Sequence, residues 1–281
     1  MTMNSIPRIP LGEWVDVFVT SLYAHFEGLF RGFSYIIGGF VDLLTNFLTL
    51  IPAFLMIIIV CFLVWYTTRK ISLVVFALIG LLFILNINYW GQTMQTLALV
   101  LTSVIISIIV GIPIGILASQ NERFSKILRP TLDFMQTMPA FVYLIPAITF
   151  FGVGVVPGII ASVIFAMPPT IRFTDLGIRQ VPEDLIEAAN AFGSTTSQKL
   201  FKVQLPLATG TIMAGVNQSI MLSLSMVVTA SLVGAPGLGV DVYRSVTQVN
   251  IGMGFEAGLA IVVIAIVLDR ITQGFHKKRR V

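Results

Sequence analysis

Long hydrophobic runs separated by short polar segments dominate the chain. A helix needs about 20 apolar residues to cross a bilayer, and seven runs approach or reach this length: 51–67, 71–88, 96–118, 136–152, 156–171, 211–234 and 256–269. The fourth and fifth runs are short and are broken by prolines at 139, 146, 168 and 169. Such breaks are tolerated in a membrane only where protein or a cavity satisfies the backbone. The pattern predicts an all-α polytopic membrane protein with about seven transmembrane helices.

Residues 1–50 mix apolar and charged positions. The pattern is typical of an amphipathic helix at the membrane surface, because apolar side chains recur at helical spacing at Trp14, Val15, Phe18, Leu22, Phe26, Leu29, Phe30 and Phe33. Residues 32–50 are long enough to span, but Asp42 would then lie inside the membrane at a cost in free energy. We therefore favour an amphipathic interfacial or re-entrant segment over a true span.

The longest polar segment between hydrophobic runs, residues 181–208, predicts two short helices with a sharp break. Pro182 suits a first helical position, and Gly193 stands where a glycine commonly ends a helix. Thr195 and Gln198 form a capping-box pattern that starts a second helix, and Pro206 is expected to close the unit. The first helix would carry one apolar face that needs a partner: Leu185, Ala188, Ala189 and Phe192.

Composition agrees with a membrane protein and excludes several classes of site. Hydrophobic residues make up 56% of the 281 residues and charged residues only 11%, against about a quarter charged in soluble domains. A single cysteine excludes a disulfide framework, and the two histidines have no metal-ligand spacing. No phosphate-binding loop or hydrolase motif is present, so we expect neither an enzyme nor a bound cofactor, and no removable signal peptide is expected.

Charge predicts the orientation. If the C-terminal end is inside and the seven runs alternate, 14 of the 17 Lys and Arg residues fall inside, leaving Arg8, Arg31 and Arg244 outside. This distribution satisfies the positive-inside rule. It predicts a cytoplasmic C-terminus and a cytoplasmic segment 181–208, with the N-terminus outside. An eighth span at 32–50 would place the N-terminus inside.

Residues Glu187-Ala188-Ala189, then Gly193, then Val203-x-Leu205-Pro206, resemble the EAA loop of permeases from ABC importers. In that family the loop is a docking helix that inserts into a cleft of the cytoplasmic ATPase. Val203 replaces the usual Ile and keeps a β-branched apolar side chain. The resemblance implies that ATPase coupling depends on Glu187, Ala188, Ala189, Phe192, Gly193, Val203, Leu205 and Pro206.

Three longer blocks, residues 133–147, 165–208 and 217–239, are similar to the glycine betaine/proline betaine branch of that family. The resemblance implies a type I importer permease core of five helices at 91–275, with its coupling loop at 173–210. Two accessory helices at 51–90 would precede it and a basic cytoplasmic tail at 276–281 would follow. It also implies an extracellular binding protein, two ATPase copies that bind ATP and Mg²⁺, a permease homodimer in the cell membrane, and no nucleic acid.

Candidates for a translocation path combine polar or aromatic character with broken or small-residue helices: Met138, Tyr143, Asn217, Gln218 and Ser219. Each could equally pack against a neighbouring helix. Small residues four apart in two runs also predict close helix packing. The implied activity is osmoprotectant import by alternating access. The alternatives are a permease for methionine or another small solute, and an ATP-independent osmolyte channel or carrier.

Overall fold

The computed structural model describes residues 10–278, with side chains described through residue 274, and the regular elements of this part are helices. In chain order they are α1 (Leu11–Leu50), α2 (Ala53–Thr68), α3 (Ile71–Asn86), α4 (Trp90–Gln120), α5 (Glu122–Thr137), α6 (Ala140–Phe151), α7 (Val155–Arg179), α8 (Glu183–Ala191), α9 (Thr196–Lys199), the π-helix η1 (Leu200–Gln204), α10 (Leu205–Ser225), α11 (Val227–Ser231), α12 (Leu238–Thr247) and α13 (Ile251–Lys278).

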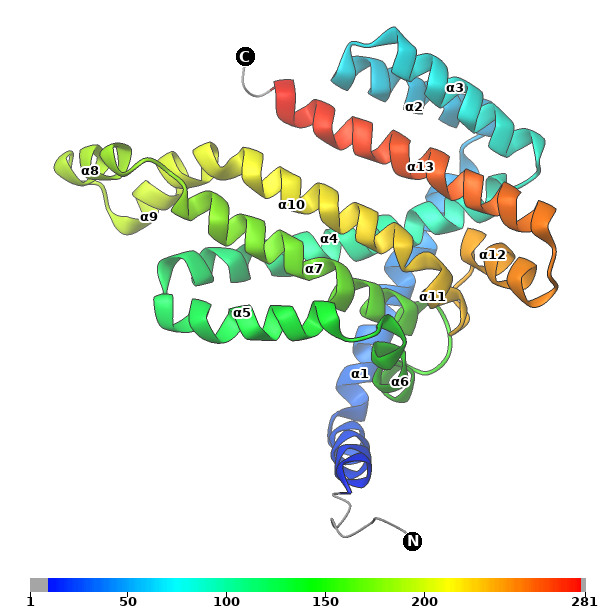
Figure 1. Ribbon diagram of the computed structural model, residues 1–281, viewed down its shortest axis with the longest axis horizontal. Helices are drawn as coiled ribbons and strands as arrows, with labels where there is room; N and C mark the ends of the chain where they lie inside the picture. Colours follow the sequence, from blue (N-terminus) through cyan, green and yellow to red (C-terminus); the bar gives the residue numbers. More distant parts are fainter. Residues whose placement is uncertain (1–9, 279–281) are drawn as a thin grey trace, which may run out of the picture.

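Helices α4, α7 and α10 form the centre of the molecule (Figure 1). They approach closely because glycines face neighbouring backbones. A Cβ added at Gly115 of α4 would lie 2.7 Å from the Ile171 carbonyl oxygen, and one at Gly215 of α10 would lie 2.9 Å from the Pro169 carbonyl oxygen. The Ser219 hydroxyl also donates across this interface to the Ala166 carbonyl at 2.5 Å. The predicted small-residue stripes are therefore helix-packing faces.

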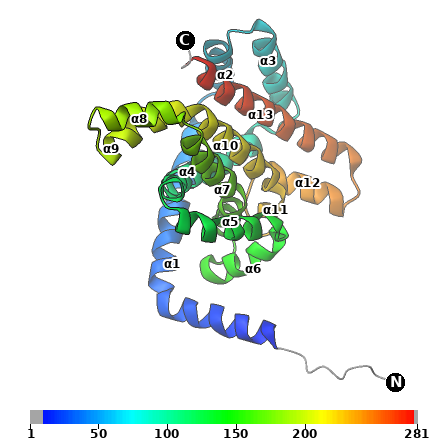
Figure 2. The ribbon, with the colours of Figure 1, turned by 60° about the vertical axis from the view of Figure 1, so that its left-hand side comes forward.

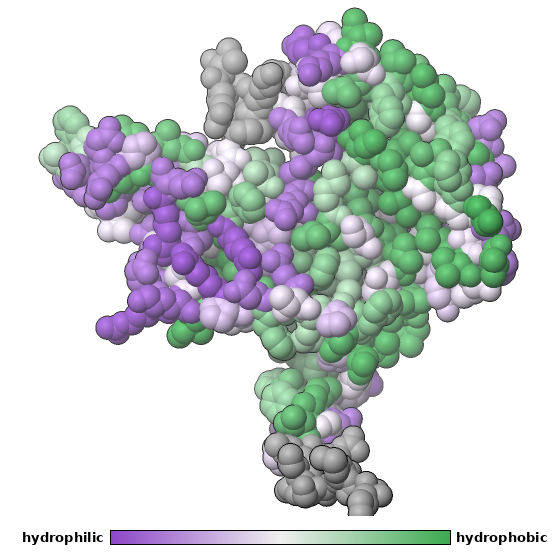
Figure 3. Space-filling model, viewed as in Figure 1, coloured by the Kyte–Doolittle hydropathy of each residue, from purple (hydrophilic) through white to green (hydrophobic). Residues whose placement is uncertain are grey.

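A second layer is built from α2, α3 and α13, which lie beyond α10 in Figure 1. An apolar cluster joins this layer to the centre through residues such as Val64, Ile84, Val216, Ile220 and Val263. The side of α2 and α3 away from the core remains apolar and exposed, with Phe54 68% and Ile79 62% exposed. Figure 3 shows the hydrophobic surface over this side and hydrophilic residues gathered over α5, α8 and α9.

Helix α1 is bent at Phe26, where φ is −119° and ψ is 20°. The part before the bend stands away from the body (Figure 2), and Trp14 is 60% exposed. The part after the bend contacts the N-terminal ends of α4 and α7 and the C-terminal end of α6, so it crosses these helices rather than running alongside them. Its contacts are Phe30 with Phe150, Ile37 and Val41 with Leu99 and Ile159, and Leu48 with Met94 and Ala98.

Residues 32–50 lie in the helical part of α1 that follows the bend at Phe26, and their placement in or on the membrane stays a prediction. Within the described residues, α1, α4, α7 and α13 are long and apolar enough to cross a membrane. The bent pair α5 and α6 would make a fifth span, and α2 and α3 are shorter apolar helices of 16 residues each. With α10, which has 21 residues, and without α1, which the sequence places at the membrane surface, these elements correspond to the seven predicted runs. About seven membrane helices are therefore compatible with the structure.

The predicted boundaries of three runs are wrong. The run 136–152 is not one span, because α5 ends at Thr137 and α6 begins after a bend of 98°. Pro139 causes this break, since a proline drives the preceding residue into extended backbone, and Met138 has φ −64° and ψ 134°. With 12 residues, α6 is only about 18 Å long.

The other two corrections concern α7 and α10. Helix α7 continues through Pro168 and Pro169 to Arg179, because both prolines are buried against neighbouring helices that hold the segment in place. The run 211–234 begins earlier, at Leu205, and is interrupted at Met226 between α10 and α11.

Candidate functional site

The segment 183–204 folds as a compact elbow between α7 and α10, and we call it the coupling elbow. Helix α8 ends at a turn in which Gly193 has a φ of +74°, a conformation that favours glycine. Helix α9 then begins with the predicted capping box. The Thr195 side chain accepts from the Gln198 amide at 3.3 Å, and the Gln198 side chain accepts from the Thr195 amide at 3.0 Å. The two-helix prediction is confirmed.

The coupling elbow protrudes from one end of the helical bundle (Figures 1 and 2). Its predicted apolar face is split by the fold. Ala189 is buried against the second half of the elbow, whereas Leu185 is 40% exposed and Phe192 is 91% exposed. Glu187 and Ala188 are also exposed. This face therefore presents apolar and acidic side chains together at the tip of a protruding element.

Pro206 does not close the elbow, contrary to the prediction. Helix α9 passes through the π-helix η1 into α10 without a break, and Pro206 lies in the first turn of α10, a position that tolerates proline. Leu205 packs in a cluster with Ile178, Ala208 and Ile212, and Val203 is half-buried. The second half of the elbow is therefore continuous with α10, and its base is anchored to α7 and α4.

The five path candidates do not converge on one cavity. Tyr143 is buried, and its hydroxyl donates to the Met135 carbonyl. Met138 lies at the bend between α5 and α6 and packs in the same apolar cluster as Tyr143. Ser219 is fully buried and bonds to the Thr170 hydroxyl at 2.7 Å.

The remaining two candidates lie on α10 and face different ways. Asn217 is tied to α13, because its Nδ2 donates to Asp269 at 2.7 Å and its Oδ1 accepts from Thr272 at 2.8 Å. Gln218 is exposed. Among the five, only Gln218 presents a polar side chain on an open helix face.

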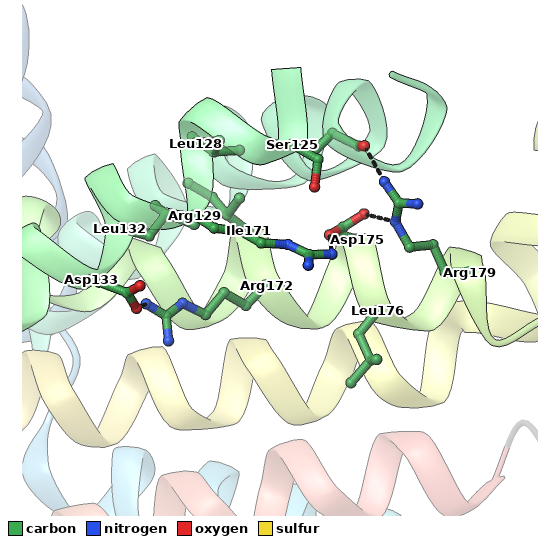
Figure 4. Close-up of a pocket in the computed structure, with 11 residues that line it drawn as sticks. Ser125, Leu128, Arg129, Leu132, Asp133, Ile171, Arg172, Asp175, Leu176 and Arg179 are labelled. Carbon is green, nitrogen blue, oxygen red and sulfur yellow. Dashed lines mark hydrogen bonds and ion pairs between the residues drawn. The ribbon is translucent and has the colours of Figure 1, made fainter. Parts of the chain in front are cut away.

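A cluster of ion pairs lies beside the coupling elbow. It was not predicted from the sequence, because its arginines were considered only as positive charge on the cytoplasmic side. Figure 4 shows these side chains around a cavity of about 410 Å³ between α5 and α7. Arg172 pairs with Asp133 at 2.5 Å, Arg129 with Asp175 at 3.5 Å, and Arg179 with Asp175 at 2.6 Å. The i,i+4 spacing of Asp175 and Arg179 was the available local signal, but the partners on α5 are distant in sequence.

The described residues contain no group of three or more His, Cys, Asp or Glu side chains placed to hold a metal ion. The site consists of a protruding apolar tip, a positive-φ turn, and a continuous connection into the central helices. The basic tail 276–281 has no described side chains, and residues 279–281 lie outside the described part of the chain.

Comparisons with known proteins agree with this arrangement. A family model described as "Binding-protein-dependent transport system inner membrane component" matches residues 111–281. The glycine betaine transport system permease protein OpuAB of Bacillus subtilis (strain 168) is 61% identical over 279 residues, covering 99% of this chain and 98% of that protein. The glycine betaine/carnitine transport permease protein GbuB of Listeria monocytogenes is 54% identical over 281 residues, covering 99% of each.

A solved structure supports the fold alone. One chain of the MetNI methionine ABC transporter, in an inward-facing conformation, matches with a TM-score of 0.61 at 20% identity. The match covers 66% of this chain and 93% of that chain. The central helices therefore have the architecture of a type I importer permease.

Proposed function

We propose, because the chain belongs to the family of inner-membrane permeases of binding-protein-dependent ABC importers, in its glycine betaine branch, that it carries glycine betaine or a related quaternary ammonium osmoprotectant. It is a multi-pass transport subunit of the inner membrane rather than an enzyme, and it works with a separate ATPase and a separate substrate-binding protein. The substrate rests on relatives named for glycine betaine that match nearly the whole chain.

The coupling elbow is the element that docks on the ATPase. The observation that carries this proposal is Phe192, which is 91% exposed beside a positive-φ turn on a protruding tip. Burying a Phe side chain in a partner contributes about 1.5–3 kcal/mol. Leu185 and Ala188 share this face of α8, and Glu187 adds a charge beside it. Val203, Leu205 and Pro206 support the elbow from its base instead of meeting the partner.

The orientation follows from charge. The hydrophilic elbow end of the molecule (Figure 3) faces the cytoplasm together with the C-terminus. The ends of α4 and α7 that α1 crosses then face outward, which supports an interfacial α1 and an N-terminus outside. Segments 1–50, 51–90 and 91–275 act as surface anchor, accessory helices and permease core.

Transport proceeds by alternating access in a homodimer. Two ATPase copies bind ATP and Mg²⁺, close on each other, and move the two elbows. Because each elbow continues into α10, its movement is transmitted directly to the central helices. Gln218 lies on the open face of α10 and is the path residue that we retain, while Ser219, Asn217, Tyr143 and Met138 hold the surrounding helices in register.

Uptake into vesicles tests this function. Vesicles containing this chain, its ATPase and its binding protein are loaded with or without ATP and supplied with labelled glycine betaine. We expect uptake that requires all three proteins and internal ATP. ATP-independent uptake by this chain alone would instead identify a carrier or channel. Binding-protein-stimulated ATP hydrolysis without betaine uptake would keep the permease function and reject the substrate.

A further inference from the structure

Arg179 is the last residue of α7, and its guanidinium contacts three parts of the protein at once. Its Nε donates to Asp175 Oδ1 on its own helix at 2.6 Å, and its Nη2 donates to the Ala118 carbonyl of α4 at 2.7 Å. Its Nη1 donates to Glu122, the first residue of α5. Pro182 and α8 follow directly, so this side chain lies where α7 enters the coupling elbow.

The two acceptors outside α7 lie on either side of the turn that joins α4 to α5. Asn121 caps α5 at this turn by accepting from the amides of Arg123 and Phe124 at 3.0 and 3.1 Å. The turn is therefore a defined unit, and Arg179 holds both of its flanks. The Arg179 side chain is 28% exposed, but the Glu122 side chain is 67% exposed. Water therefore screens the link to Glu122 more than the contact with Asp175, which is 11% exposed.

The interface between α5 and α7 is open in its middle. The cavity of about 410 Å³ lies between the two helices, and the buried hydroxyl of Ser125 at its wall has no hydrogen-bond partner among the described residues. Ion pairs cross this space between α5 and α7, as Figure 4 shows for Asp133 with Arg172 and for Arg129 with Asp175. The interface between α7 and α4 is different from that between α7 and α5, because Gly111 and Gly115 allow α4 and α7 to pack closely.

The charges of this ion-pair network balance one another, although Glu122 is not among the residues that line the cavity. Three arginines, at 129, 172 and 179, meet three carboxylates, at 122, 133 and 175. The arrangement therefore fits a set of internal ties better than a site for a bound ion. Helix α5 is held to α7 by directional polar contacts, and these contacts can change their geometry without repacking an apolar core.

We propose that Arg179 is a positioning residue that transmits the movement of the coupling elbow to the α4–α5 turn, so that α5 and α6 move together with α7 during transport. The inference rests on the proposed docking of the elbow on the ATPase. Helix α6 follows α5 after the bend at Met138, and it packs against α7 through Tyr143, Leu144 and Ala161. Arg179 thus connects the coupling elbow to α5 and, through α5, to α6, which packs against the central helix α7.

The guanidinium is required because it offers five donors in a planar fork. A lysine at position 179 reaches one or two of the three acceptors and keeps the charge. A glutamine removes the charge and most of the donors. The two substitutions therefore separate a role in charge from a role in joining three elements.

The test is the number of glycine betaine molecules imported per ATP hydrolysed, measured in vesicles with the complete transporter. We expect Arg179→Gln to lower this ratio at least tenfold while the ATPase still copurifies and hydrolyses ATP. Arg179→Lys should restore part of the ratio. Arg31→Gln is the matched control, since it removes an exposed i,i+4 ion pair with Glu27 on α1 and should leave the ratio unchanged.

Glu122→Gln provides a second variant that keeps the Asp175–Arg179 pair and weakens only the link to α5. We expect it to lower the ratio three- to tenfold. The double variant should be no worse than Arg179→Gln alone, because both changes break one connection. An unchanged ratio in Glu122→Gln, or losses that multiply in the double variant, would overturn the inference.

Two outcomes for Arg179→Gln would also overturn it. A wild-type ratio would show that the tie carries no movement, and loss of ATPase copurification would show that Arg179 shapes the docking surface instead. Failure of the proposed function looks different, because the unaltered complex would then show no ATP-driven uptake at all.

Discussion

Gly193 and Phe192 occupy adjacent positions at the tip of the coupling elbow, and their roles differ. Gly193 supplies a backbone conformation with φ +74°, and a Cβ added there would meet no atom within 4 Å in the described residues. Any intolerance of a side chain at this position therefore comes from backbone conformation or from a partner protein. Phe192 supplies exposed apolar area for that partner.

Gly193→Asp tests the packing of a partner at the turn, with Gly193→Asn as its matched control. Asn and Asp both tolerate the left-handed conformation, so the two variants differ mainly in charge. We expect Gly193→Asp to lose ATPase copurification or to hydrolyse ATP without uptake, and Gly193→Asn to keep most of the uptake. Full transport by a well-expressed Gly193→Asp variant would contradict the assignment of this joint.

Phe192→Ala separates docking from folding. Because the side chain is 91% exposed, the midpoint of thermal unfolding of the isolated permease should not change. Losing its burial against the ATPase should weaken association by about 1.5–3 kcal/mol, which is roughly 10- to 150-fold in the dissociation constant. The measurement is titration of the detergent-solubilised permease with its ATPase. Unchanged affinity would exclude Phe192 from the interface.

At the scale of elements, the predictions that were confirmed depend on local chemistry. The capping box at Thr195, the turn at Gly193 and the two-helix elbow involve residues within a few positions of each other, so the sequence reveals them directly. The contacts of Arg179 with Glu122 and with the Ala118 carbonyl were missed because these residues are 57 and 61 positions away in the sequence.

The predicted breaks at prolines were only partly confirmed. The break at Pro139 is present, whereas Pro146 lies inside α6 and Pro168 and Pro169 lie inside α7. The surroundings differ, because Pro168 and Pro169 are buried in α7 where it packs on α4 and α10. Tertiary contacts of this kind cannot be read from the local sequence.

Gly115→Ala tests the close approach of α4 and α7. Alanine favours a helix over glycine by about 1 kcal/mol, but the new Cβ would lie 2.6 Å from Thr174 Cβ and 2.7 Å from the Ile171 carbonyl oxygen. We expect a net destabilisation of about 1–3 kcal/mol, seen as a lower unfolding midpoint in detergent. Gly39→Ala, which meets nothing within 4 Å, should keep or raise the midpoint.

At the scale of the whole molecule, the surface is hydrophilic at the end that carries the coupling elbow and apolar over the accessory helices. Hydrophilic residues gather at the elbow end (Figure 3). The accessory helices α2 and α3 expose apolar side chains, among them Phe54 and Ile79. This distribution supports a molecule that crosses the membrane with its elbow in the cytoplasm. It also explains why α1 is largely exposed in the single chain, since lipid can cover its apolar positions.

Thiol labelling tests this orientation. In a background with Cys61 replaced by alanine, one cysteine is introduced at Ser197 in α9 or at Val249, which is 82% exposed between α12 and α13. A membrane-impermeant maleimide should label Val249→Cys in intact cells and Ser197→Cys only after permeabilisation. The reverse pattern would contradict a cytoplasmic elbow.

Cross-linking from the elbow tests the central claim most directly. Phe192→Cys in the Cys61→Ala background is treated with a short thiol-to-amine cross-linker in membranes that contain the complete transporter. The control is Tyr35→Cys on α1, because the Tyr35 side chain is 85% exposed. We predict a permease–ATPase product from position 192 and none from position 35. A well-labelled Phe192→Cys that still copurifies with the ATPase but forms no such product would contradict the docking of the coupling elbow on the ATPase.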